Sequence, residues 1–158
     1  RGFNWALDKQ LQSELRDRIR TLNMGLEDRL GNAIGSLSGG QRQALTLLMA
    51  SWLKPDLLLL DEHTAALDPK SADQVIRLTK EIIERDRLTT LMVTHSMQQA
   101  VHLGNRIIMM HKGQIIHDYK GSTRQGVRSE DLLHRFEEVR RREQVDVRVA
   151  ELLQRMYV

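Results

Sequence analysis

Residues 57–62 read Leu-Leu-Leu-Leu-Asp-Glu, a run of four leucines that ends in two acids. By itself such a run fits a helix or a strand, but Pro55 just before it and the acids after it favour a strand. Strands that are covered on both faces are continuously apolar, so we expect a buried strand of a parallel sheet. Residues 89–94 predict a second strand of the same kind.

Helices are expected on both sides of these strands. Apolar residues recur at three- and four-residue steps over residues 6–22 and 70–85, which is the spacing of an amphipathic helix. Further helices are expected from Gly39 to about Leu53 and from Ser96 to about Leu103, with a short helical turn around Glu27–Leu30. Strands that alternate with helices indicate an α/β fold.

The last third of the chain predicts a hairpin and a helical tail. Residues 106–111 and 114–119 flank Lys112-Gly113, which is typical of a β-hairpin. The tail from about Ser129 to Val158 is expected to be helical. A break is expected near Val145–Val147, where β-branched residues alternate with charged ones.

Composition narrows the class of protein. The 158 residues are 41% hydrophobic and 28% charged, which fits a folded domain, and the absence of cysteine excludes disulfides and thiolate metal sites. No apolar run reaches the roughly 18 residues that span a bilayer. The net charge of +3 comes largely from Arg140–Arg142. Because acids such as Glu137 and Glu138 interleave with them, we expect a solvated, ion-paired helix face there and not a nucleic-acid site.

Polar residues follow both predicted strands. Asp61-Glu62 follow the first and Thr94-His95 the second. Ligands of parallel sheets bind outside the carboxyl ends of strands, and right-handed crossovers bring those ends to one edge, so the acids and the imidazole are expected to converge. Two carboxylates suit Mg²⁺ and an attacking water. The alternative is that the acids only cap the next segment and that His95 is an ordinary loop histidine.

Residues 37–43 read Leu-Ser-Gly-Gly-Gln-Arg-Gln at the start of a predicted helix, with Ser38 as its N-cap. Gly39 and Gly40 leave backbone N–H groups unobstructed where the helix dipole places about half a positive charge. Together with the serine hydroxyl they would form a small anion cradle suited to a terminal phosphate. The simpler alternative is a helix cap after a flexible turn.

The combination of motifs resembles ATP-binding cassette (ABC) ATPases over about residues 4–123. Residues 37–43 resemble the signature motif of that family, Leu57–Glu62 its Walker B strand, Ala66-Leu67-Asp68 its D-loop and His95 its switch histidine. The nucleotide-binding subunits of bacterial importers are the most similar in pattern.

This resemblance implies an α/β, partial P-loop NTPase fold with a parallel sheet and flanking helices. Residues 1–53 would form the helical subdomain that carries the signature motif. Residues 54–123 would form the C-terminal half of the ATPase core. The resemblance does not cover residues 124–158, which their own apolar spacing predicts to be a helical tail.

It also implies roles on the phosphate side of the site. Ser38, Gly39 and Gly40 would contact the γ-phosphate of an ATP that a partner cassette holds, and Gln41 would lie near its ribose. Asp68 would link the two sites across a head-to-tail dimer.

Three residues would act in hydrolysis. Asp61 would hold Mg²⁺, Glu62 would polarise the attacking water, and His95 would contact the γ-phosphate. The cofactors implied are thus ATP and Mg²⁺, and catalysis would consist of positioning and charge stabilisation.

The sequence departs from the family pattern in two ways. No G-x-x-G-x-G-K-[ST] loop and no Gly-Lys dipeptide occur, so we expect the C-terminal portion of a cassette that by itself neither binds nor hydrolyses ATP. His63 stands where many family members have proline. Expected partners are a second cassette, in a homodimer or heterodimer, and transmembrane permease subunits, with no nucleic acid. The expected location is the cytoplasm, at the inner face of the cell membrane.

Two other functions remain open from the sequence. The chain could be a non-catalytic module that pairs with another cassette or with membrane subunits. It could also belong to a soluble ABC-type ATPase of DNA repair or translation, although no long coiled-coil insertion lies near the signature motif.

Overall fold

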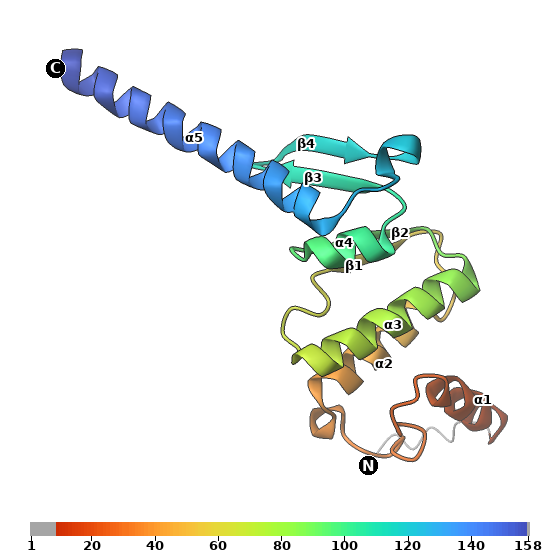
Figure 1. Cartoon of the computed structure of the whole chain (residues 1–158). Coiled ribbons are helices and arrows are strands. Elements are labelled where there is room, and N and C mark those ends of the chain that lie inside the picture. Colours follow the sequence, from red (N-terminus) through yellow and green to blue (C-terminus); the bar gives the residue numbers. More distant parts are fainter. Residues whose placement is uncertain (1–8, 158) are drawn as a thin grey trace. The chain divides into compact units, whose positions relative to one another are not determined.

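The computed structural model describes residues 9–157 and, within them, the side chains of residues 10–142 and 144. The chain divides into two compact units, Arg1–Val93 and Thr94–Val158 (Figure 1). The elements of the first unit are α1 (Lys9–Arg20), η1 (Ile34–Ser36), α2 (Gly39–Ser51), β1 (Leu58–Asp61), α3 (Pro69–Asp86) and β2 (Thr90–Val93). Those of the second are α4 (Met97–Leu103), β3 (Ile107–His111), β4 (Gln114–Tyr119), η2 (Gly121–Arg124) and α5 (Ser129–Tyr157).

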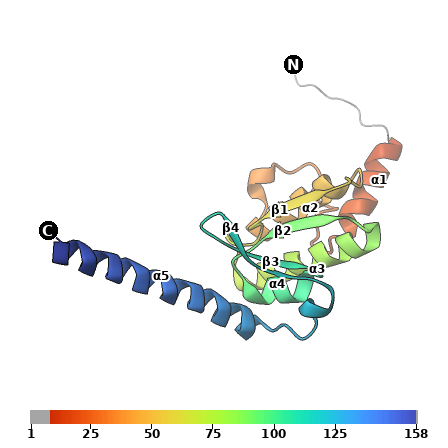
Figure 2. The same ribbon diagram turned by 90° about the horizontal axis from the view of Figure 1, so that it is seen from above.

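The first unit contains the predicted pair of parallel strands. β1 and β2 lie side by side with Leu59 opposite Leu91 and Asp61 opposite Val93 (Figure 2). Just past the end of β1, the backbone N–H of Glu62 donates to the carbonyl oxygen of Val93 at 3.0 Å. The carboxyl ends of both strands therefore lie at one edge, as expected for strands joined by a helical crossover.

Only one face of this sheet is buried. Leu58 and Leu60 are 4% and 8% exposed and belong to the core that α2 and α3 complete with Leu47 and Ile82. On the opposite face Leu59 is 65% exposed, and Leu57, Leu91 and Val93 are also more than half exposed. The prediction that both strands are buried was therefore wrong for that face, because the described residues supply apolar cover on one side only.

Helices α2 and α3 pack against each other and cover the buried face of the sheet (Figure 1). α3 begins with Asp68 as N-cap and Pro69 at its first position, where proline loses no helical hydrogen bond. It ends at Asp86, and its C-cap Arg87 has a left-handed φ of 53° and an N–H that donates to the carbonyl of Ile83. α3 thus begins and ends on local signals, and the positions of both helices agree with the predicted ranges.

The N-terminal part of the first unit is attached through α1 and the turns that follow it. The guanidinium group of Arg18 lies 4.2 Å from the ring centre of Trp52, at the end of α2, and its Nη1 donates to the Trp52 carbonyl at 3.4 Å. The helical turn predicted around Glu27–Leu30 was wrong. Separate turns occur there, such as the hydrogen bond from the N–H of Arg29 to Leu26, because the glycines on either side interrupt a continuous helix.

The second unit is built on the predicted hairpin. β3 and β4 are antiparallel with a register shift between Met109 and Met110. Ile107 and Met109 on the buried face of β3 pack with Leu132 of α5, which is fully buried, and with residues of α4. Arg124 donates to the carbonyl oxygens of Val101 and Gly104 and so caps the end of α4.

Helix α5 is continuous over 29 residues. The break predicted near Val145–Val147 was therefore wrong, because the arginines, glutamates and leucines around those valines favour helix more than the valines oppose it. The side chains of Leu152, Leu153 and Met156 lie outside those that the structure describes. No described helix combines the length and apolarity needed to cross a membrane.

Candidate nucleotide site

The first half of the candidate site is the N-terminus of α2, which a reciprocal pair of hydrogen bonds holds. The N–H of Gln41 donates to the Ser38 hydroxyl at 3.2 Å, and the N–H of Ser38 donates to the Gln41 side-chain oxygen at 3.0 Å. This is a capping box, so the sequence prediction that Ser38 is the N-cap is confirmed. The side-chain nitrogen of Gln41 also donates to the carbonyl of Met24, in the turn after α1, at 3.2 Å.

The two glycines lie where α2 approaches the first turn of α3 and the residues just before it. A Cβ atom added to Gly39 would lie 3.0 Å from Cδ2 of Leu67, and one added to Gly40 would lie 3.0 Å from Cβ of Ser71. The absence of a side chain at Gly40 is therefore what lets α2 lie this close to α3, whereas the contact at Gly39 is with the end of a flexible side chain. Neither glycine carries a side chain that could cover the first N–H groups of the helix, as an anion cradle requires, and Gly40 itself is buried.

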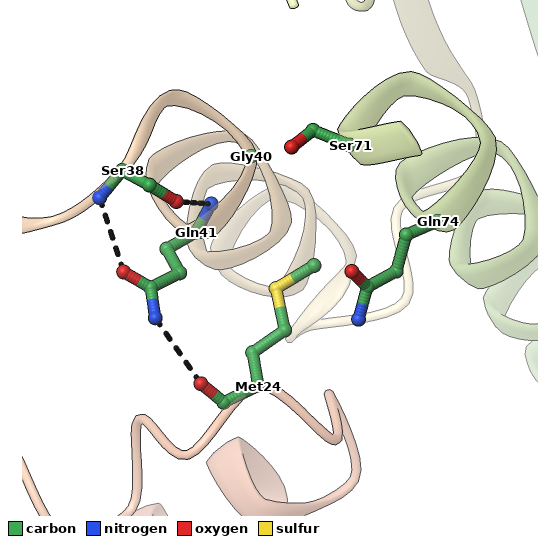
Figure 3. Close-up of a pocket in the computed structure, with 6 residues that line it drawn as sticks. All are labelled: Met24, Ser38, Gly40, Gln41, Ser71 and Gln74. Atoms are coloured by element: carbon green, nitrogen blue, oxygen red, sulfur yellow. Dashed lines mark hydrogen bonds between the residues drawn. The ribbon is translucent and has the colours of Figure 1, made fainter. Parts of the chain in front are cut away.

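A small open pocket lies beside this helix start (Figure 3). It has a volume of about 170 Å³ and is lined by residues of α2, of α3 and of the turn after α1: Met24, Ser38, Gly40, Gln41, Ser71 and Gln74. Sites for drug-sized ligands are larger, about 300–1,000 Å³. The pocket could therefore accept a phosphate group but not a whole nucleotide.

Asp68 is joined to this half of the site through Ser71. The N–H of Ser71 donates to a carboxylate oxygen of Asp68 at 3.0 Å, which caps α3. Hydrogen bonds from the side chain and backbone of Ser71 lower the pKa of the Asp68 carboxyl group. The structure thus brings together the residues predicted for the phosphate side, Ser38 to Gln41, and the segment that ends in Asp68.

The second half of the candidate site is the acid pair at the end of β1. Asp61 and Glu62 are both exposed. Glu62 has a φ of 39°, in the left-handed region that residues with a side chain seldom adopt. Such backbone strain persists where the surrounding structure imposes it, and it is often found at functional sites.

His63 fastens the acid pair to α3. Its Nε2 lies 3.1 Å from the hydroxyl oxygen of Thr79, and that hydroxyl itself donates to the carbonyl of Val75 at 2.8 Å. Because the hydroxyl has one hydrogen, Nε2 must be the donor toward Thr79. Burial lowers the pKa of the His63 imidazole, which favours the neutral ring.

His95 lies in the second unit, in the bend that leads into α4. On either side of it, the N–H of Ser96 donates to the Thr94 hydroxyl at 3.0 Å, and the Ser96 hydroxyl caps α4 by accepting from the N–H of Gln99 at 3.3 Å. His95 itself is exposed. Its predicted convergence with Asp61 and Glu62 stays a prediction, since they belong to the first unit.

Sequence reasoning did not identify several residues of these two regions. Ser71, Gln74 and Met24 line the pocket, and Thr79 holds His63. A signal existed for Ser71 alone, because it follows Asp68 at the spacing of an N-cap and its partner N–H. Thr79 lies within a helix, where its sequence position indicates only burial.

The residues of both halves fit ATP and Mg²⁺ in kind. The glycine pair forms a cradle that a Cβ would narrow, and Asp61 offers an exposed carboxylate. Within the described part of the chain, no three His, Cys, Asp or Glu side chains are grouped to hold a metal ion. Mg²⁺ is usually held by one or two carboxylates together with phosphate oxygens and water, so Asp61 suffices as the protein ligand if ATP supplies the rest.

Comparison with known proteins agrees with these features. The family model described as ABC transporter matches residues 5–65. A tyrosine transport ATP-binding protein of Clostridioides difficile is 43% identical over 125 residues, which cover 79% of this chain and 50% of the relative. A methionine import ATP-binding protein of Bacillus cereus is 35% identical over 75% of this chain and 36% of the relative. A phosphate import ATP-binding protein of Mycobacterium intracellulare is 36% identical over 75% of this chain and 41% of the relative.

A solved transporter structure gives the same result at the level of the fold. It is described as an inward-facing conformation of a metal-chelate type ABC transporter, and it matches with a TM-score of 0.66 and 28% identity. The match covers 82% of this chain and 50% of that chain, which confirms the predicted fold class. The chain spans about half the length, or less, of the curated relatives.

Proposed function

Because this chain belongs to the family of ABC transporter ATPases, we propose that it supplies the signature-motif and hydrolysis residues of the ATP-binding subunit of an importer. The observation that carries the proposal is the capped start of α2, where Gly39 lies against Leu67, just before Asp68, and Gly40 lies against Ser71, which bonds to Asp68. A pocket of phosphate size beside this helix start supports it. The names of the three relatives give three different cargoes, so the cargo of this protein is left unassigned.

The phosphate side would act by binding and orienting. The N–H groups of Gly39 and Gly40 at the start of α2 and the Ser38 hydroxyl would hold the terminal phosphate of an ATP whose remaining contacts come from a second cassette. The capping box keeps the Ser38 oxygen and the helix start in one arrangement before any ligand arrives. Such preorganised donors stabilise charge on a transferring phosphoryl group without rearranging during the reaction.

The acid side would act on water. Glu62 would accept a hydrogen bond from the attacking water and turn its lone pair toward the phosphorus, and Asp61 would be the protein ligand of Mg²⁺. His95 would donate a hydrogen bond to the γ-phosphate. Mg²⁺ bound with ATP would neutralise charge on the phosphate oxygens. Asp68 would contact the facing cassette, so that the two sites of a dimer are linked.

This assignment places the chain within a larger assembly. The 158 residues contain no phosphate-binding loop of the G-x-x-G-x-G-K-[ST] type, whose backbone and lysine hold the β- and γ-phosphates in P-loop proteins. The complete cassette, with that loop present, is therefore the form we expect to bind ATP. Its partners would be a second cassette and the permease subunits at the inner face of the membrane.

The test compares this chain with the complete cassette. Calorimetric titration with Mg-ATP should give micromolar binding for the complete cassette and no measurable binding for the 158 residues alone. In the complete cassette, Ser38→Ala should reduce ATP turnover while Mg-ATP still binds. Tight binding of Mg-ATP to the chain alone would contradict the division of the site. Turnover that is insensitive to Ser38 would favour an interaction module without a catalytic role.

A further inference from the structure

Gly40 and Ser71 form the closest approach between α2 and α3 at the candidate site. A Cβ at Gly40 would lie 3.0 Å from Cβ of Ser71 and 3.2 Å from its hydroxyl oxygen. Figure 3 shows the Ser71 side chain directed from α3 toward Gly40. Carbon atoms prefer separations of about 3.5–4.0 Å, so an added Cβ must push the helices apart by several tenths of an ångström.

This contact differs from that of the neighbouring glycine. A Cβ at Gly39 would meet only Cδ2 of Leu67, the end of a flexible side chain that can rotate away. The atom facing Gly40 is a Cβ, which rotation of the Ser71 side chain cannot move. Gly40 is therefore required by the position of the α3 backbone, independently of any ligand.

Ser71 also holds Asp68. Its N–H donates to the Asp68 carboxylate at 3.0 Å, in the first turn of α3. One residue thus contacts both Gly40 of the signature motif and the acid at the end of the Ala66–Asp68 segment.

The surroundings make this junction rigid. One turn further along each helix, Ala44 of α2 and Val75 of α3 are both fully buried. Close-packed helices move as units, because the packed protein interior between them has few voids into which a side chain could shift. A displacement of Asp68 would therefore be transmitted to the start of α2 through Ser71.

We infer that Ser71 is a positioning residue of the nucleotide site: its Cβ sets the distance of the α2 N-terminus from α3, and its N–H sets the position of Asp68. This inference rests on the proposed function, which makes both ends of the junction part of one ATP-dependent dimer. Ser71 itself touches no reacting atom in this account. Through Ser71, a contact that a facing cassette makes at Asp68 would also shift the start of α2 and so adjust the phosphate cradle.

The experiment is a double-mutant cycle at positions 40 and 71 in the complete cassette. Gly40→Ala should lower kcat by about tenfold or more, because small misplacements of a catalytic site reduce turnover strongly, and should leave KM for Mg-ATP within about twofold. Adding Ser71→Gly removes the opposing Cβ and should restore most of the lost kcat, measured against Ser71→Gly alone.

Ser71→Ala is the matched control. It removes the hydroxyl, as Ser71→Gly does, but retains the Cβ, so Gly40→Ala/Ser71→Ala should stay as impaired as Gly40→Ala. Equal recovery with alanine and glycine, or no recovery with either, would overturn the inference. No recovery would mean that the added methyl group at position 40 collides with something other than Ser71.

A second readout separates this inference from the proposed function. The same cycle is measured by urea unfolding of the 158-residue chain, without nucleotide. Gly40→Ala should shift the midpoint to lower urea by more in the wild-type background than in Ser71→Gly, because helix propensity contributes equally to both. Coupling in unfolding with no ATPase activity in the complete cassette would refute the proposed function and the positioning role but retain the contact, whereas ATPase activity without coupling would refute the inference alone.

Discussion

The start of α2 and the end of β1 carry equally suggestive motifs, but the protein holds them in different ways. At the start of α2, the hydroxyl, amide and backbone groups of Ser38 and Gln41 bond to one another, and Gly40 packs on α3. At the end of β1, the two acids are exposed, and Glu62 has a strained backbone. Their neighbour His63 provides the attachment to α3.

This difference separates a preformed region from one that is completed by its ligands. A cradle of backbone donors must be rigid before the phosphate arrives, since its value lies in preorganisation. A carboxylate that orders water and Mg²⁺ gains its final geometry from those ligands. We therefore expect substitutions in the first region to affect folding and function together, and those at the acids to affect function alone.

The largest effect is expected for Glu62→Gln in the complete cassette. Removing the carboxylate that orients water should reduce ATP turnover by about 10²- to 10⁴-fold, and the exposed side chain should leave the urea midpoint unchanged. Glu81→Gln, an exposed acid of α3, is the control. Unchanged turnover, or a large loss of stability, would contradict the contrast between the two regions.

Thr79→Val tests the attachment of the acid pair. It leaves the Nε2–H of His63 without its acceptor, so unfolding of the first unit should become easier by about 1–3 kcal/mol. The same substitution is measured in a His63→Leu background by urea denaturation. There the cost should shrink, because no imidazole is left unpaired, and an equal cost in both backgrounds would show that the bond to His63 is unimportant.

Ser38→Ala tests the preformed region by its stability. Loss of the N-cap oxygen should destabilise the chain by about 1 kcal/mol. Ser36→Ala is the matched control, because the hydroxyl of Ser36 also bonds to a backbone carbonyl, that of Ala33 at 2.7 Å, but caps no helix. Equal urea midpoints for the two variants would show that the capping box does not hold the start of α2.

The smallest effect is expected for Asp86→Asn, which lies in neither region. Hydrogen bonding to Arg85, and then to Lys54, lowers the pKa of the Asp86 carboxyl group. A carboxyl group whose pKa is lowered by folding stabilises the folded state at pH values above its usual pKa of about 3.9. This stabilisation disappears as the pH falls through the folded-state pKa. Asp86→Asn should therefore lower the free energy of unfolding by less than about 1 kcal/mol at pH 7, because Arg85 and Lys54 are exposed. At a pH below the folded-state pKa it should not change that free energy. A cost that is the same at pH 7 and below pH 3 would refute the ion-pair origin.

Much of the fold could be predicted because local signals and periodicity agree. Pro55, the leucine run and the acids predicted β1, and the apolar steps of residues 70–85 predicted α3. The exposed face of the sheet could not be predicted, because a continuous apolar run indicates burial without showing whether the cover is present in the chain. The continuity of α5 through Val145–Val147 was missed because two valines lower helix propensity by too little to end a helix.

The motif residues of the candidate site could be named from the sequence, but their internal supports could not. Gly40 fits the recognised motif with or without Ser71, and nothing in the spacing of residues 40 and 71 indicates that they meet. The pairing of His63 with Thr79 likewise depends on how β1 lies on α3. Contacts of this kind arise from packing between elements that are distant in sequence, and roles for Asp61, Glu62 and His95 in hydrolysis stay predictions until the variants are measured.

The open face of the β1–β2 sheet has a consequence for the cell that makes this polypeptide. Leu59, Leu91 and Val93 present branched side chains to water, on two strands whose outer edges no described strand pairs. If these 158 residues were synthesised alone, chaperones and proteases would bind the exposed apolar face. Co-synthesis with the polypeptide that covers this face should therefore raise the yield of intact protein, which pulse-labelling with and without that partner would measure.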